Sequence, residues 1–153
     1  MVFVTGATGI LGRIIVLELL KKGIKVRAAK RPESNLEEVK HSLSFYTENA
    51  QPFFNEIEWF NVDFTDIHSL EEALKGVTEV YHCAAKVSFN PKDEKEMYET
   101  NIKGTENLLY ACEGSSVQKF LHVSSIAVLD LFNDKGELDE SSDFNAKEEH
   151  SAY

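Results

Sequence analysis

The chain has 153 residues and a formal net charge of −10 at pH 7, so it is long enough for one domain with a single core and too acidic to favour a nucleic-acid partner. Charged residues interrupt its apolar stretches and no signal peptide or membrane span is visible, so we expect one cytoplasmic domain over residues 1–153 without membrane association. Cys83 and Cys112 are too few for a disulfide framework and too isolated for a metal site, which predicts two reduced packing residues and no bound metal.

Apolar runs of strand length alternate along the chain with segments of helical periodicity. The predicted strands are Met1–Thr5, Lys25–Ala29, Ile57–Val62, Glu79–Ala84 and Phe120–Ser124. This alternation predicts an α/β fold, in which a doubly wound, mostly parallel sheet has helices on both faces.

Helices are predicted between the strands, each with its own start or stop signal. The first follows a glycine turn and ends at Gly23, and the second begins at a capping box, Ser34–Glu37. The third follows Asp66 and ends at Gly76. The fourth is the longest and carries one inward-facing stripe, formed by Met97, Asn101, Thr105, Leu108 and Cys112.

Two segments lack a clear period. Residues Gln51–Glu56 are predicted to form a loop, and residues 130–150 are polar and acidic. Five strand-and-helix units begin a doubly wound sheet without adding a substrate-binding part, so we expect the sequence to be the C-terminally truncated front of a longer protein.

The stretch "VTGATGILG", Val4–Gly12, lies between the first strand and the first helix. A helix N-terminus presents unpaired N–H groups and partial positive charge, and a glycine turn lets its backbone approach an anion such as a phosphate. Gly6 permits the tight turn, Gly9 the close approach, and Gly12 the packing of helix on strand. Glycines that merely shape a strand-to-helix turn are the alternative.

The spacing in this turn resembles the T-G-x-x-G-x-x-G signature of the extended short-chain dehydrogenase/reductase superfamily. Further motifs agree in chain order: "NVDFTD" from Asn61, "YHCAA" from Tyr81, "NIKGT" from Asn101 and "VSSIAV" from Val123. The stretches "VRAAKRPES" and "YHCAAKVSF" are most similar to the dihydroflavonol-reductase-like branch. Nucleotide-sugar epimerases and dehydratases share the other motifs.

The resemblance implies a Rossmann-type NAD(P)-binding domain and a set of cofactor-binding residues. Asp63 contacts the adenine, Phe64 lies beside it, Ala84 and Ala85 line the cofactor, and Ser124 lines the nicotinamide pocket. The glycine signature contributes Thr5, Gly6, Thr8, Gly9, Ile10, Leu11 and Gly12 to the same set. Asn101 joins it by ordering the serine and tyrosine region, or acts only as a tether from helix to strand.

The end of the second strand distinguishes NADP from NAD, because an acidic residue there accepts the ribose 2′-hydroxyl of NAD and a cation suits the 2′-phosphate of NADP. This strand is followed by Lys30 and Arg31, and the planar fork of Arg31 suits a phosphate. The sequence therefore favours NADP, with NAD as the alternative. Glu33 is close enough to compete for Arg31 or to pair with it, which leaves a solvated basic turn open.

The resemblance places the catalytic serine at Ser125 and the catalytic tyrosine at Tyr153, the final residue. Such a tyrosine moves the hydroxyl proton during hydride transfer, and the family's lysine, four residues later, lowers its pKa. That lysine would follow the last residue, so we expect this chain alone to be inactive. An ordinary loop tyrosine is the alternative reading of Tyr153.

Two residues near these motifs are predicted to be structural. His82 is interpreted as a packed strand histidine rather than a base, and Lys86 as a solvated lysine. The sequence as a whole predicts part of an NADP-dependent oxidoreductase that acts on a small ketone, aldehyde or alcohol. An epimerase or dehydratase of nucleotide sugars and a non-catalytic dinucleotide sensor remain alternatives, and a homodimer is compatible with each.

Overall fold

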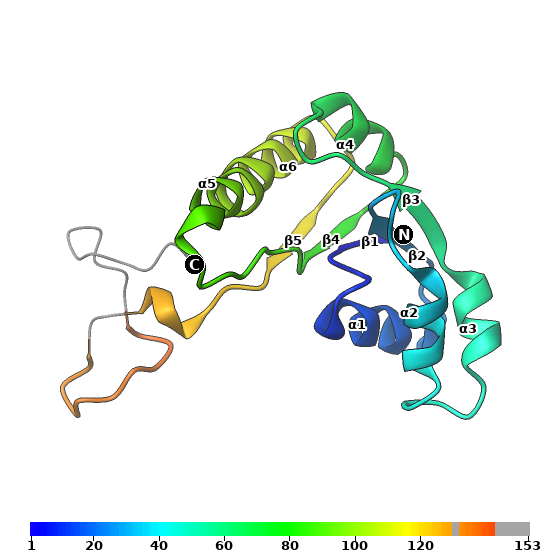
Figure 1. Cartoon of the computed structure of the whole chain (residues 1–153), viewed down its shortest axis with the longest axis horizontal. Coiled ribbons are helices and arrows are strands. Elements are labelled where there is room, and N and C mark those ends of the chain that lie inside the picture. The colour runs from blue at the N-terminus through cyan, green and yellow to red at the C-terminus, as the bar shows by residue number, and fades with distance from the viewer. Residues whose placement is uncertain (130–131, 143–153) are drawn as a thin grey trace.

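A five-stranded parallel sheet organises the computed structural model, which describes residues 1–129 and 132–142 (Figure 1). Its strands are β1 (Val2–Thr5), β2 (Val26–Lys30), β3 (Glu58–Asn61), β4 (Glu79–His82) and β5 (Lys119–His122). Their order is β3-β2-β1-β4-β5, so consecutive strands run outward on either side of β1. This topology confirms the predicted doubly wound Rossmann-type fold, in which ligands bind where the strand order reverses.

Helices cover both faces of the sheet, as Figure 1 shows for α1 to α3 on one face and α4 to α6 on the other. They are α1 (Ile10–Lys21), α2 (Leu36–Leu43), α3 (Ala50–Glu56), α4 (Ile67–Ala73), α5 (Glu94–Met97) and α6 (Gly104–Glu113). Successive side chains of β1 enter opposite cores because side chains alternate along a strand. Phe3 packs with Leu70 and Leu108, whereas Val4 packs with Val16 and Leu20.

The prediction of a loop at Gln51–Glu56 is wrong, because α3 occupies this segment. Phe53 and Phe54 pack against the core on the α1 side, and the rings of Phe54 and Trp59 lie 5.9 Å apart. Pro52 falls in the first turn of the helix, where proline is tolerated. Burial of the two phenylalanines therefore favours a helix that lacks a clear start signal in the sequence.

The predicted capping box at Ser34–Glu37 is also wrong, by one residue. The N-cap of α2 is Asn35, whose side-chain oxygen accepts a hydrogen bond of 3.2 Å from the backbone N–H of Glu38. The hydroxyl oxygen of Ser34 instead accepts from the backbone N–H of Arg31, at 3.1 Å. Ser34 thus stabilises the turn after β2 rather than the helix.

The fourth predicted helix is not a uniform α-helix. Its α-helical turns α5 and α6 flank a π-helical segment, η2 (Tyr98–Lys103), and short 3₁₀ turns lie at Pro91–Asp93 and Ile126–Val128. The predicted stripe still faces inward, with Met97 and Leu108 buried. In the part of the chain that the structure describes, no helix is long and apolar enough to cross a membrane.

Candidate cofactor site

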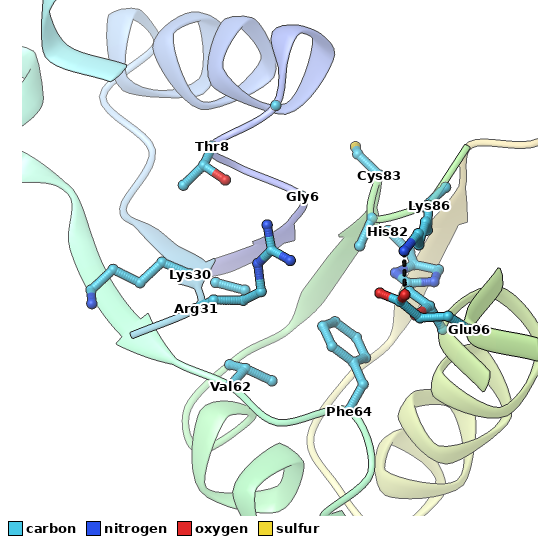
Figure 2. Close-up of a pocket in the computed structure, with 15 residues that line it drawn as sticks. Gly6, Thr8, Lys30, Arg31, Val62, Phe64, His82, Cys83, Lys86 and Glu96 are labelled. Carbon is cyan, nitrogen blue, oxygen red and sulfur yellow. Dashed lines mark ion pairs between the residues drawn. The ribbon is translucent and has the colours of Figure 1, made fainter. Parts of the chain in front are cut away.

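A cleft of about 480 Å³ opens at the carboxyl ends of β1, β2 and β4 (Figure 2). Its walls combine the glycine turn after β1, the end of β2, the segment after β4, and α5. Eight of the predicted cofactor residues line it: Gly6, Thr8, Gly9, Lys30, Arg31, Phe64, Ala84 and Ala85. The structure therefore brings together motifs that lie far apart in the sequence.

The glycine turn depends on two positions without a side chain. Gly6 has a φ of +63°, and a Cβ atom there would lie 2.7 Å from the backbone of Cys83 and Ala84. A Cβ atom on Gly12 would lie 2.2 Å from the carbonyl oxygen of Gly6. The turn is consequently pressed between α1 and the end of β4, with its backbone facing the cleft.

Arg13 supports this turn from the side of α2. Its Nε donates to the carbonyl oxygen of Gly9 at 3.0 Å, and its Nη2 donates to the carbonyl oxygen of Thr8. Its Nη1 donates to the hydroxyl of Ser42 at 2.6 Å. The side chain is only 12% exposed, so these bonds are shielded from water. Sequence reasoning gave Arg13 no role, because an arginine in the first turn of a helix carries no signal of what it contacts.

The wall after β4 is fixed from two sides. The hydroxyl oxygen of Thr5 accepts hydrogen bonds of 3.1 Å from the backbone N–H groups of Cys83 and Ala84. The side chain of Asn101 accepts from the backbone N–H of Lys86 at 2.8 Å and donates to its carbonyl oxygen at 2.9 Å. Thr5 and Asn101 thus hold the wall without being among the residues that line the cleft, which supports the tether interpretation of Asn101.

An ion pair between Lys86 and Glu96 lies at the edge of the cleft (Figure 2). Both residues line it, together with Thr100 and Cys83. The prediction that Lys86 is a solvated lysine is therefore wrong, since its side chain is 29% exposed and paired. Sequence reasoning missed Glu96 and Thr100 because their helix lies at the cleft only through the tertiary fold.

The adenine side of the site is a second cleft of about 500 Å³ that shares Arg31 and Phe64 with the first and adds Asp63. The side-chain amide of Asn107 donates to the carbonyl oxygen of Phe64 at 2.8 Å, which fixes this wall to α6. The hydroxyl of Thr65, and to a lesser extent its backbone N–H, lowers the pKa of Asp63 below its ordinary value. Asp63 is therefore a charged acceptor at neutral pH.

The two cations after β2 differ in orientation. In Figure 2 the side chain of Arg31 points toward the glycine turn, whereas Lys30 points away from it. The Nζ of Lys30 donates to the side-chain oxygen of Asn61 at 2.6 Å. The Nε of Arg31 lies 3.2 Å from the carboxylate of Glu33, and both side chains are mostly exposed. Arg31 is thus the cation that faces the cleft, and Glu33 pairs with it.

The remaining predicted residues lie outside the walls of both clefts. Ile10 and Leu11 are exposed at the start of α1, and Gly12 packs against the turn from behind. Ser124 is exposed and Ser125 half-buried, both directly before the 3₁₀ turn at Ile126–Val128. Tyr153 lies outside the described residues, so its relation to Ser125 stays a prediction.

His82 is the one buried titratable side chain at the base of the cleft among the described residues. It is 2% exposed, and its ring stacks on that of His122 with centroids 5.4 Å apart. Burial, and secondly the neighbouring His122, lowers the pKa of His82 to about 4. Burial also raises the pKa of the Cys83 thiol, so this cysteine is not activated as a nucleophile. The interpretation of His82 as a packed residue agrees with this environment.

A glycine turn, a cation after β2 and an alanine-lined wall at one switch point fit a dinucleotide, because no Cβ atom obstructs the turn at Gly6 or Gly9. The sequence profile of the NAD dependent epimerase/dehydratase family matches residues 2–153. The chain belongs to this family. Membership confirms the predicted resemblance to the extended short-chain dehydrogenases/reductases.

Curated relatives in this family include oxidoreductases. The chain is 32% identical over 152 residues to the decarboxylating sterol-4-alpha-carboxylate 3-dehydrogenase of Dictyostelium discoideum, which covers 99% of this chain and 40% of the relative. It is 33% identical over 132 residues to the bifunctional dihydroflavonol 4-reductase/flavanone 4-reductase of Malus domestica, covering 85% of this chain and 36% of the relative. The chain thus spans about two fifths of the length of these relatives.

A solved structure of a short-chain dehydrogenase/reductase superfamily protein from Agrobacterium tumefaciens resembles this fold with a TM-score of 0.64 and 29% identity. The alignment covers 84% of this chain and 33% of that protein, whose structure contains bound NAD. The family is thus one of NAD(P)-binding enzymes, and the likeness extends to the part of the fold that forms the cleft.

Proposed function

We propose that the chain is the NADP-binding part of an oxidoreductase that interconverts a ketone or aldehyde and the corresponding alcohol. The observation that carries this proposal is the position of Arg31, which lines the same cleft as the glycine turn and also the adjoining cleft of Asp63 and Phe64. A dinucleotide with a 2′-phosphate needs anion-binding groups at these two places.

The residues present fit such a cofactor. Backbone N–H groups at the start of α1 would bind the pyrophosphate, and Arg31 would bind the 2′-phosphate through its planar fork. Phe64 and Asp63 would hold the adenine, while Ala84 and Ala85 would leave room for the nicotinamide half. NADP bound there would accept or supply a hydride.

Proton movement in this proposal belongs to Ser125 and Tyr153. Ser125 would hold the substrate oxygen, and Tyr153 would exchange a proton with it. His82 is excluded as the base because it is buried and its pKa lies far below neutral pH. The names of the curated relatives, a 3-dehydrogenase and a 4-reductase, support hydride transfer at a carbon that bears oxygen.

A second candidate is an NAD-dependent epimerase or dehydratase, and the pairing of Glu33 with Arg31 favours it. A carboxylate beside Arg31 would oppose a 2′-phosphate, and the matched family includes both reaction types. Such enzymes return the hydride to their substrate and have no need to release the cofactor between turnovers.

The two candidates differ in how the cofactor is retained. The chain would be purified, dialysed extensively and denatured, and the released nicotinamide dinucleotide identified and quantified by chromatography. The oxidoreductase proposal predicts that little cofactor remains and that added NADPH binds again, as measured by its fluorescence. Stoichiometric NAD that survives dialysis would support the epimerase or dehydratase instead.

A further inference from the structure

The buried contact between Thr5 and His82 has a defined direction. A threonine hydroxyl has one proton to donate and two lone pairs to accept with. The Oγ1 of Thr5 accepts from the backbone N–H groups of Cys83 and Ala84, each at 3.1 Å. Both lone pairs are therefore used, so the 2.7 Å contact with Nδ1 of His82 must use the hydroxyl proton of Thr5. Nδ1 is the acceptor and carries no proton.

This direction fixes the tautomer of the ring. A neutral imidazole with an unprotonated Nδ1 carries its proton on Nε2. The Nε2 of His82 lies 2.9 Å from the hydroxyl oxygen of Thr105, which accepts this proton. The Thr105 hydroxyl in turn donates to the carbonyl oxygen of Asn101 at 2.6 Å. The three side chains form one relay from β1 to the helix, with every donor used.

Both ends of the relay hold the same stretch of backbone. At one end Thr5 binds the N–H groups of Cys83 and Ala84, and at the other the side chain of Asn101 binds the N–H and carbonyl of Lys86. The residues between these anchors line the cleft. Asn101 lies within the π-helical segment η2, and such segments are frequent at functional sites.

We propose that His82, held as its neutral Nε2–H tautomer, is a positioning residue that sets the backbone of residues 83–86 at the cofactor site. This inference rests on the proposed function only in naming the cofactor as the ligand of that wall. His82 takes no proton from the substrate, because each of its ring nitrogens already has a partner within the fold.

The surroundings of the ring maintain this state. Thr5 of β1 and Thr105 of α6 bind its two nitrogens, and the rings of Phe64, Phe120 and His122 lie 6.0, 5.9 and 5.4 Å from it. The imidazole of His122 is the titratable group among these neighbours, and a proton on it would disfavour a second proton on His82. Protonation of Nδ1 would also turn Thr5 away from its acceptor and break the relay.

The direction of the relay is tested by NMR on the chain without cofactor. Histidine is labelled with ¹⁵N, and the His82 signals are assigned by their absence from the His82→Gln spectrum. Long-range proton–nitrogen correlations should show an unprotonated Nδ1 and a protonated Nε2 from pH 6 to pH 8. A proton on Nδ1, or exchange between the two tautomers, would overturn the relay.

The positioning role is tested by calorimetric titration of NADP and NAD into Thr105 variants. Thr105→Val removes the acceptor of Nε2–H and should weaken binding of the preferred dinucleotide about tenfold. Thr105→Ser keeps the hydroxyl and should restore wild-type affinity. Thr78→Val is the matched control, because Thr78 donates to the carbonyl oxygen of Met1 at the opposite edge of the sheet.

The outcomes separate the inference from the proposed function. A folded Thr105→Val variant with wild-type affinity would show that Thr105 and His82 only stabilise the fold, which overturns the positioning role. A wild-type chain that binds neither dinucleotide would overturn the proposed function, while the NMR result would still decide the direction of the relay.

Discussion

The Nε of Arg31 lies 3.2 Å from a carboxylate oxygen of Glu33, two residues along the same turn after β2. Both side chains are mostly exposed, and an exposed ion pair of this kind is worth about 0 to 1 kcal/mol. The pair is therefore weak enough for a 2′-phosphate to displace Glu33, and strong enough to reduce the preference for NADP by a few fold.

Replacement of Glu33 by glutamine should raise the affinity for NADP by about three- to fivefold and leave that for NAD nearly unchanged, because only NADP has the 2′-phosphate. The measurement is calorimetric titration with each dinucleotide. Glu37→Gln, which removes an exposed acid from the first turn of α2, is the control for the change in net charge. An equal gain for both dinucleotides would show that Glu33 does not act on the 2′-phosphate.

Gly12→Ala should destabilise the chain and abolish cofactor binding. Its Cβ atom would lie 2.2 Å from the carbonyl oxygen of Gly6, so α1 must move away from the turn, at a cost of about 1 to 3 kcal/mol. Urea unfolding and cofactor titration measure the two effects. Gly114→Ala is the matched control, since a Cβ atom there meets nothing within 4 Å. Similar behaviour of the two variants would argue against close packing at Gly12.

Arg13→Met should weaken cofactor binding more than it weakens the fold. The variant keeps much of the apolar stem but leaves the carbonyl groups of Thr8 and Gly9 without their donor. Loss of these bonds frees the turn that would bind the pyrophosphate, so we expect about a tenfold loss of affinity. Lys21→Met, at an exposed pair with Glu18, is the control. Wild-type affinity in Arg13→Met would remove the turn's dependence on this side chain.

His82 predicts a pH dependence of stability. The pKa of His82 is about 4 in the folded chain and 6.5 is its ordinary value, so the unfolded chain binds more protons between these pH values. The free energy of unfolding is thus fully retained above pH 6.5 and falls as the pH decreases toward 4, by about 3 kcal/mol for this one group.

Urea unfolding of the wild type and of His82→Gln at intervals from pH 4.5 to pH 7.5 tests this dependence. The difference between the two curves isolates His82, because the carboxylates contribute equally to both. It should shrink as the pH falls. Parallel curves would mean that His82 is not held neutral in the folded state.

Much of the cofactor site could be predicted from local spacing. The glycines, Thr5 and the alanines after β4 are recognisable because each position tolerates few side chains: a Cβ on Gly6 would strike the backbone before Ala84. Glu96, Thr100 and Arg13 could not be predicted. Their roles arise from how helices lie against the turn and the cleft, and nothing in their immediate sequence specifies those contacts.

The errors in the fold have similar causes. Ser34 and Asn35 are both good N-cap residues, and the choice between them depends on the turn at Arg31, which Ser34 stabilises instead. The segment Ala50–Glu56 has few helix formers, and its helix depends on the packing of Phe53 and Phe54 against the core. Such tertiary packing overrides local propensity.

The central claim is that the cleft binds a dinucleotide whose 2′-phosphate is recognised by Arg31. Calorimetric titration of NADP and of NAD into the wild-type chain and into Arg31→Ala tests it most directly. The account predicts that NADP binds more tightly than NAD to the wild type and that this difference disappears in the variant. NAD binding as tight as NADP in the wild type, or a preference for NADP that survives in Arg31→Ala, would contradict it.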